Sequence, residues 1–167
     1  PDRAIIAYTN LIKRYFKNSK PIVLGGIEAS LRRITHYDYW SDMLRAPILF
    51  DSKADYLLYG MADNSIVEFA KALDEGKSVL HVKGLSYISK EPKTEYITLP
   101  SHQECVDDKL KFMDMFDDFY HNNDPISARG LCQKVDERYL IQNSPAAYLT
   151  TEELDGVSAL PFMRDLH

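Results

Sequence analysis

Short apolar runs alternate with amphipathic stretches along the first eighty residues. Apolar residues recur at steps of three and four over 5–16, which predicts a helix capped by Asp2. The β-branched run at 22–24 predicts a buried strand that ends at a glycine pair, and 54–59 predicts a second strand. This alternation is typical of βαβ units, so the two strands are expected to be parallel neighbours.

Helices are expected after both strands. Residues 27–42 predict a short helix followed by an aromatic loop. Ser65 and Glu68 have the spacing of a capping box, and Gly76 stands just past the last apolar position of that stretch. The pattern therefore predicts a helix from Ser65 to Gly76.

The pattern changes after Gly84. Two short apolar runs, 85–88 and 96–99, flank a polar turn and predict a small antiparallel hairpin. Ser101 is expected to cap a long helix that reaches about Tyr120. The predicted core face of this helix consists of Val106, Leu110, Phe112, Met113, Phe116, Phe119 and Tyr120.

The expected fold class is α/β, a partial doubly wound, Rossmann-like parallel sheet with helices and one antiparallel hairpin. The chain has 167 residues, the length of one domain. We expect an α/β domain over 1–128 and an irregular connector over 129–167, in which only 138–141 has a strand pattern.

Composition excludes several classes of protein. The 20 basic and 25 acidic residues give a net charge of −5, which lacks the basic footprint of a nucleic-acid-binding protein. No apolar run approaches the 18 or more residues that a membrane helix needs. Cys105 and Cys132 are too few for a disulfide framework, so we expect reduced thiols, buried as small apolar groups, and a cytoplasmic location. Because the chain opens on Pro1, we expect it to be a piece of a longer protein.

The glycines after the two strands are the first candidate site. Ligands of α/β sheets bind at the carboxyl ends of strands, where Gly25, Gly26 and Gly60 are expected to share one rim. Glu28, Ser30 and the first amides of the following helix would hold a polar or anionic group there. A tight structural turn is the alternative explanation of the glycine pair.

Two adjacent arginines follow the glycine pair. Arg32 and Arg33 have the side chain that clamps phosphate or carboxylate groups in bidentate geometry. The alternative is ion pairing with Glu28 or Asp38 on the protein surface.

The aromatic segment that follows is a candidate contact surface. Tyr37, Tyr39 and Trp40 would stack on a planar ligand or on another domain, with Asp42 beside them, or would pack in the core. His36, Asp38 and Asp42 have ligand-type side chains, but their spacing does not place them on one face, so no metal site is expected.

Three stretches, 21–34, 36–42 and 51–55, closely resemble the YgiQ family of radical S-adenosylmethionine (SAM) proteins. The stretches read PIVLGGIEASLRRI, HYDYWSD and DSKAD. The resemblance covers most of the chain and implies a cobalamin-binding-type α/β region, followed from residue 129 by the connector to an iron–sulfur core. It also implies a 4Fe-4S cluster and SAM in the parent protein.

The chain departs from this family chemistry in two respects. The cluster needs three closely spaced cysteine thiolates, which Cys105 and Cys132 do not supply, so no cofactor is expected in this chain. Cobalamin ligation in the wider group uses a histidine in an Asp-x-His-x-x-Gly pattern, and none of the five histidines lies in one. The resemblance therefore gives no reason to expect bound cobalamin.

The resemblance implies an amino-terminal accessory domain without catalytic residues. It would shape substrate access or dock on the radical SAM catalytic domain of the same chain, and Arg32, Arg33, Tyr39, Trp40 and Asp42 are the expected interface or substrate residues. Two alternatives remain open: an independent module that binds a small cofactor or nucleotide at Gly25, Gly26 and Gly60, and a structural interaction domain.

Overall fold

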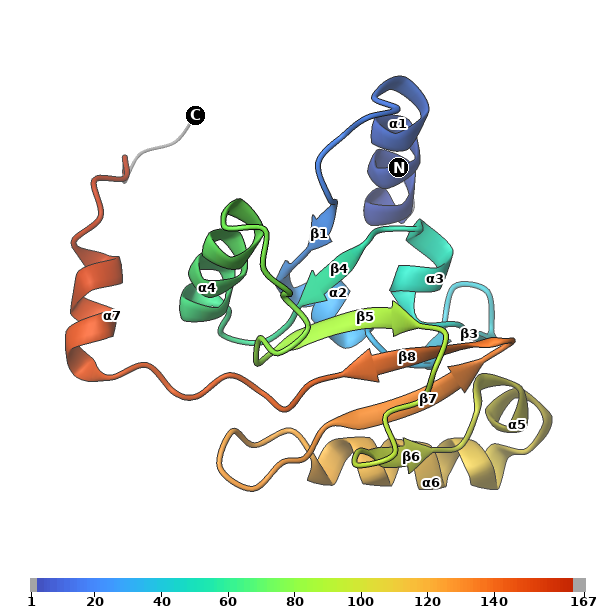
Figure 1. Ribbon diagram of the computed structural model, residues 1–167. Coiled ribbons are helices and arrows are strands. Elements are labelled where there is room, and N and C mark those ends of the chain that lie inside the picture. Colours follow the sequence, from blue (N-terminus) through green and yellow to red (C-terminus); the bar gives the residue numbers. More distant parts are fainter. Residues whose placement is uncertain (1–2, 164–167) are drawn as a thin grey trace.

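A six-stranded mixed sheet forms the centre of the computed structural model, which describes residues 3–163 (Figure 1). In spatial order its strands are β1 (Val23–Leu24), β4 (Tyr56–Leu58), β5 (Leu85–Ser89), β8 (Arg138–Gln142), β7 (Leu131–Val135) and β6 (Ile97–Leu99). The outer pairs β1–β4 and β6–β7 are parallel, and the three inner pairings are antiparallel. The α/β class and the parallel pairing of the first two strands are thus confirmed.

Helices cover both faces of this sheet. They are α1 (Ala4–Tyr15), α2 (Gly26–Leu31), α3 (Ile48–Ser52), α4 (Asp63–Asp74), α5 (His102–Asp107) and α6 (Lys109–His121). A last helix, α7 (Thr151–Ser158), has no buried residue and lies apart from the sheet (Figure 1). Leu57 packs in one core cluster with residues of α2, α3, α5 and α6, whereas its neighbour Leu58 packs in another with residues of α4. Adjacent strand residues therefore face opposite layers, as the two-residue period requires. The predicted Asp2 cap lies outside the described residues.

The aromatic loop predicted after α2 is in fact a two-stranded hairpin. Strands β2 (His36–Asp38) and β3 (Met43–Arg45) pair antiparallel, apart from the main sheet. Asp42 turns the chain in a left-handed conformation with φ of 50°. Aspartate tolerates this region better than most residues, which explains a tight turn without glycine.

The predicted capping box at Ser65 is wrong. α4 begins one turn earlier, with Ala62 as the N-cap residue and no side-chain cap. Ser65 lies inside the helix and its hydroxyl donates to the carbonyl of Lys83 at 2.8 Å. A tertiary hydrogen bond has therefore replaced the local one that the spacing favoured.

The predicted hairpin of β5 and β6 does not form. The first three residues of β5 are buried, so the strand needs neighbours on both edges and packed layers on both faces. The β7–β8 hairpin, which turns at Asp136 with φ of 52°, is inserted between β5 and β6. β6 pairs with β7 at the far edge of the sheet instead.

The strand pattern at 138–141 is confirmed as β8, but residues 131–135, which the sequence places in an irregular connector, form a second strand, β7. The irregular stretch begins only after β8. It passes into α7, which has a complete capping box formed by Thr150 and Glu153. The sheet itself shows no division at residue 128.

The long helix predicted from Ser101 is two helices with a different buried face. Ser101 and Glu104 form a capping box for α5, and Asp108 interrupts the helix by capping α6 through the amide of Leu110 at 2.8 Å. Because of this break, α6 does not continue the helical face of α5. Met115 is the fully buried residue of α6. The exposed side, named here the α6 apolar face, consists of Leu110, Met113, Phe116 and Tyr120.

The helices of this fold are short or amphipathic. Within residues 3–163, none is both long enough and apolar enough to cross a bilayer.

Two methionines of α6 test the corrected helix face, because Met115 is fully buried and Met113 is 63% exposed. Met115→Ala should lower the free energy of unfolding by about 2–5 kcal/mol through loss of packing and a residual cavity. Met113→Ala should change it by less than about 0.5 kcal/mol. Urea denaturation of the two variants measures the difference, and equal losses would contradict this packing.

Candidate functional site

The carboxyl ends of β1 and β4 lie side by side, and a glycine turn follows each. In the parallel pairing Leu24 lies beside Leu57, which brings the Gly25–Gly26 turn next to the chain leading to Gly60. Gly26 and Gly60 have φ of 82° and 70°, a left-handed conformation that side chains with a Cβ rarely adopt. The three glycines therefore form one rim, and two of them are required by backbone conformation.

A cleft of about 590 Å³ opens at this rim. Its lining consists of Val23, Leu24, Gly25, Gly26, Leu58, Gly60, Met61, Ala62, Asp63 and Ile66. The surface is largely apolar with exposed backbone at the glycines, and Asp63 is the one charged residue in the lining. Because this lining contains no histidine, it offers no imidazole ligand to the cobalt of a cobalamin.

A second cavity, of about 230 Å³, lies on the other side of the Gly60–Met61 turn. Its lining consists of Ser30, Arg33, Tyr59, Gly60, Met61, Asn123, Pro125, Pro145, Ala146, Ala147 and Tyr148. The hydroxyl of Ser30 accepts a long hydrogen bond, 3.4 Å, from the amide of Gly60. Ser30 thus lines this cavity and not the cleft at the glycine pair, whereas Gly60 lines both.

Arg33 is the charged residue of the second cavity. Its Nε donates to Gln142 Oε1 at 2.9 Å, and its two terminal nitrogens donate to the carbonyl of Ser30 and to Asn123 Oδ1. The guanidinium carbon lies 4.4 Å from the ring centroids of Tyr59 and Phe119. Burial lowers the pKa of Arg33 to about 10, so the side chain remains a cation at neutral pH.

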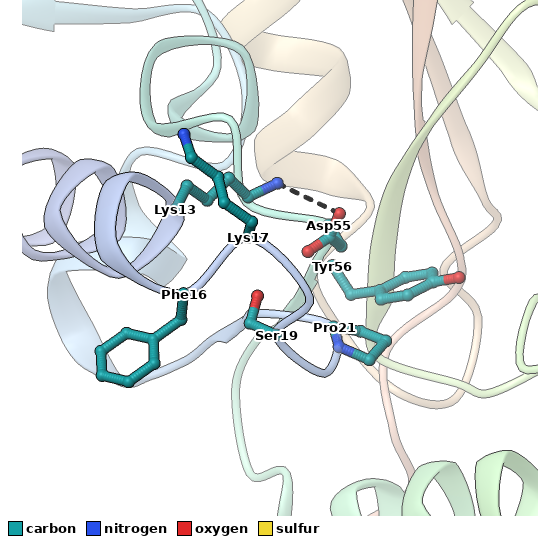
Figure 2. Close-up of a pocket in the computed structure, with 7 residues that line it drawn as sticks. All are labelled: Lys13, Phe16, Lys17, Ser19, Pro21, Asp55 and Tyr56. Carbon is teal, nitrogen blue, oxygen red and sulfur yellow. Dashed lines mark hydrogen bonds and ion pairs between the residues drawn. The ribbon is translucent and has the colours of Figure 1, made fainter.

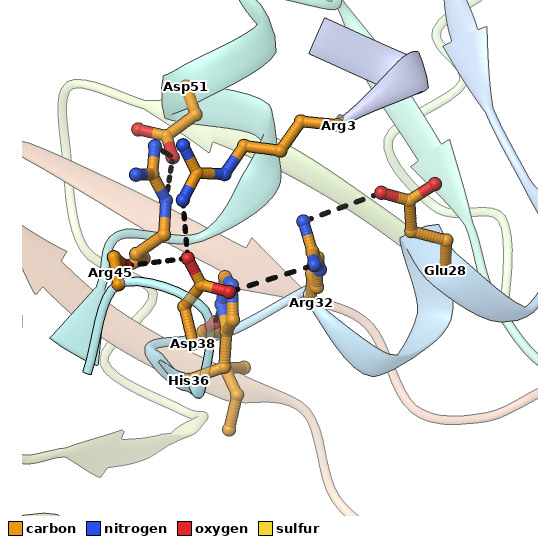
Figure 3. Close-up of polar contacts among 9 residues, drawn as sticks. Arg3, Glu28, Arg32, His36, Asp38, Arg45 and Asp51 are labelled. Atoms are coloured by element: carbon orange, nitrogen blue, oxygen red, sulfur yellow. Dashed lines mark hydrogen bonds and ion pairs between the residues drawn. The ribbon is translucent and has the colours of Figure 1, made fainter. Parts of the chain in front are cut away.

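Arg32 points the other way and takes part in an ion-pair network (Figure 3). Its guanidinium lies 3.4 Å from Glu28 and 4.0 Å from Asp38. Ion pairing, the alternative considered for the two arginines, therefore holds for Arg32. The same contact draws the carboxylate of Glu28 to Arg32, and Glu28 is not among the residues that line the cleft.

Asp38 is the centre of this network. Its side chain is 1% exposed, accepts a hydrogen bond from Ser41 Oγ at 2.7 Å and pairs with Arg3. The hydrogen bonds from Ser41 and Arg3 lower the pKa of Asp38 to about 2. The buried carboxylate thereby ties α1, α2 and the β2–β3 hairpin together.

The end of that hairpin presents aromatic side chains to solvent. The rings of Tyr39 and Trp40 stack at a centroid distance of 5.0 Å and are 69% and 77% exposed. Tyr37 donates from its hydroxyl to Asp42 at 2.7 Å. Core packing, one of the two explanations considered for these rings, is therefore wrong. Tyr37, Tyr39 and Trp40 are called the hairpin tip below.

A third hollow, of about 400 Å³, lies at the opposite ends of the strands, where Pro21 precedes β1 and Tyr56 begins β4 (Figure 2). Lys13 approaches Asp55 at 3.3 Å, and Asp55 also accepts from the amide of Ile22 at 2.8 Å. The sequence pattern does not single out this hollow as a site. Its lysines, Lys13 and Lys17, stand at the carboxyl end of α1, where basic side chains are expected for structural reasons alone. Asp55 is already engaged by these two groups, which hold α1 to the sheet.

The two cysteines lie apart in the fold, Cys105 on α5 and Cys132 on β7, and both are buried. Burial raises the pKa of both thiols, that of Cys105 to about 11, so they remain protonated at neutral pH. The part of the chain that the structure describes contains no group of three His, Cys, Asp or Glu side chains placed to bind a metal.

Comparison with known proteins covers the whole chain. The model of the family described as Radical SAM N-terminal matches residues 1–167. UPF0313 proteins of Fusobacterium nucleatum, Clostridium botulinum and Clostridium perfringens are 54%, 45% and 44% identical over 168, 172 and 173 residues. Each alignment includes 100% of this chain but only 30%, 27% and 26% of the relative. No solved structure matches the chain.

Asp38→Asn tests the network. The folded-state pKa of Asp38 is lowered from 3.8 to about 2, so its ionised form stabilises the fold above about pH 4, and this contribution is lost as the pH falls towards 2. We expect the variant to melt several degrees lower than the wild type at pH 7, with the difference closing between pH 4 and pH 2.

Asp42→Asn is the matched control for Asp38→Asn, on the same hairpin. Asn also tolerates the left-handed conformation of residue 42, so little change in melting temperature is expected at any pH. A pH-independent difference between Asp38→Asn and the wild type would contradict the ionic role of Asp38.

Proposed function

Because the chain belongs to the Radical SAM N-terminal family, we propose that it is the non-catalytic amino-terminal domain of a radical SAM enzyme. The observation that carries the proposal is the family match over residues 1–167, together with relatives that are more than three times longer. The remainder of such a full-length protein would hold the catalytic domain.

The cysteines of this chain do not fit a 4Fe-4S cluster. A SAM-cleaving cluster is held by three thiolates, and this chain has two cysteines, on separate elements, with thiols kept neutral by burial. We therefore assign the cluster and SAM to the part of the full-length protein outside these residues. Cys105 and Cys132 are structural, with Sγ atoms packed in the two core layers.

The role we propose for the domain is to dock on the catalytic domain through the hairpin tip. Aromatic side chains with neighbouring arginines are the composition of energetically important interface residues. Tyr39 and Trp40 are exposed but held in place, because the Asp38 network fixes the strands that carry them. A rigid aromatic surface loses little conformational entropy when it is covered.

Binding of a small molecule at the glycine rim is the second candidate function. The observation that favours it is the 590 Å³ cleft at the carboxyl ends of two parallel strands. This is the place where α/β sheets bind ligands. The two functions are compatible, since the domain would then present a bound ligand to the catalytic domain.

Iron reconstitution tests the assignment of the cluster. Under anaerobic conditions with iron and sulfide, the full-length protein should take up a 4Fe-4S cluster and cleave SAM, whereas the 167-residue chain should do neither. The full-length Cys105→Ser/Cys132→Ser variant should retain the cluster absorption. Loss of the cluster in that variant would contradict the proposal.

Trp40→Ala tests docking. Because Trp40 is 77% exposed, the variant chain should melt within about 1–2 °C of the wild type. In the full-length protein the same change should lower SAM cleavage and make the junction after the domain more sensitive to limited proteolysis.

Phe116→Ala on the α6 apolar face is the comparison for the docking test, as another exposed aromatic residue. A loss of activity in Phe116→Ala but not in Trp40→Ala would move the docking surface to α6. Loss in neither variant would leave the proposed docking role without support.

A further inference from the structure

We propose that the cavity beside Gly60 is a binding site for an oxyanion, a carboxylate or phosphate group, held by Arg33. This inference goes beyond the docking role and does not depend on it. It rests on an imbalance of charge and hydrogen-bond donors around one buried side chain of this chain.

Arg33 is the one buried Arg or Lys side chain in the part of the chain that the structure describes. Arg33 is 7% exposed, and no carboxylate of residues 3–163 lies within 4.0 Å of its nitrogens. By contrast, Arg3 and Arg32 share Asp38, and Arg45 pairs with Asp51. A buried cation without a counter-ion carries a large desolvation cost, and a bound anion would offset it.

The guanidinium also has N–H groups that donate to no acceptor among residues 3–163. Its five N–H groups make three hydrogen bonds within residues 3–163, all to neutral acceptors on Gln142, Ser30 and Asn123. The rings of Tyr59 and Phe119 lie against the guanidinium carbon, so a further polar partner would reach the two remaining N–H groups at the edge of the guanidinium plane. An approach along that edge is the bidentate geometry in which arginine binds carboxylate and phosphate.

The walls of the cavity suit a small anionic group. Pro125, Pro145 and Ala146 supply apolar surface, which lowers the local dielectric constant and strengthens the attraction to Arg33. Ser30 and Tyr148 place hydroxyl groups in the same lining. One cation, hydroxyl-bearing residues and apolar walls within about 230 Å³ are typical of a site for the anionic end of a small organic acid or phosphate ester.

The test follows the Arg33 Nε–H signal of the 167-residue chain by ¹H–¹⁵N NMR during titration with inorganic phosphate and with acetate. The signal is identified by its absence from Arg33→Lys. We expect a saturable shift with at least one of the two anions, a rise in melting temperature with the same anion, and no saturation with sodium chloride at equal ionic strength.

Three variants complete the test. Arg33→Lys should weaken anion binding at least about tenfold, because a lysine lacks the planar fork. Arg14→Lys makes the same replacement on the exposed surface of α1 and should leave binding unchanged. Ala147→Glu, at the exposed side of the cavity, supplies a carboxylate from the protein and should raise the melting temperature while reducing phosphate and acetate binding.

Two results would overturn the proposal in the variants that fold. An unsaturable shift like that of chloride, or unchanged binding in Arg33→Lys, overturns the proposal. If Arg33→Lys does not fold, a failure of Ala147→Glu to stabilise the chain and to reduce binding overturns it. Repeating the titration on the full-length protein identifies the source of the oxyanion: a response points to a free ligand, and loss of the response points to a carboxylate of the remaining chain.

Discussion

The pairing of β5 with β8 joins two halves of the sheet that are separate in sequence. Strands β1, β4 and β5 come from residues 23–89, and β6, β7 and β8 come from residues 97–142. In this pairing Ser86 lies opposite Gln142, and both side chains are fully buried. The end of β8 then supports the rim, because Gln142 accepts from Arg33 and the carbonyl of Asn143 accepts from Tyr59. The cavity at Gly60 consequently has walls from both halves of the chain.

Two signals confined to a few residues predicted parts of this fold correctly. The apolar run before Gly25 and the cap at Ser101 act through neighbouring backbone groups, and both are found where the pattern placed them. The capping box expected at Ser65 is not, because a tertiary hydrogen bond engages that hydroxyl. Strand partners beyond the first pair were not predictable, because any apolar run fits either edge of a sheet. The exposed face of α6 was misassigned for a related reason: Asp108 resets the helix phase, and nothing in the apolar spacing reports such a break.

Arg32 and Arg33 show how far the site could be predicted. Both were expected to recognise an anion or to pair on the surface, and sequence alone treats them alike. Both lie just past the end of α2 at Leu31, where the chain turns out of the helix. Arg32 reaches the Glu28 and Asp38 carboxylates, whereas Arg33 lies between two rings. The Arg33 environment depends on Gln142, more than 100 residues away, so no local pattern contains it. The loop glycines were predictable because their conformational requirement is local.

The place of β8 in the middle of the sheet has a consequence for synthesis on the ribosome. β5 ends at Ser89 and β8 at Gln142, so about 50 residues are translated between them, which takes about 3–10 s at ordinary elongation rates. Throughout that interval the nascent chain has an open strand edge on β5, the kind of edge that pairs with other chains and with chaperones. Because of the spatial order of the strands, every newly made chain is open to edge-to-edge aggregation until β8 has been synthesised. A chain truncated before β8 would keep the edge of β5 unpaired permanently.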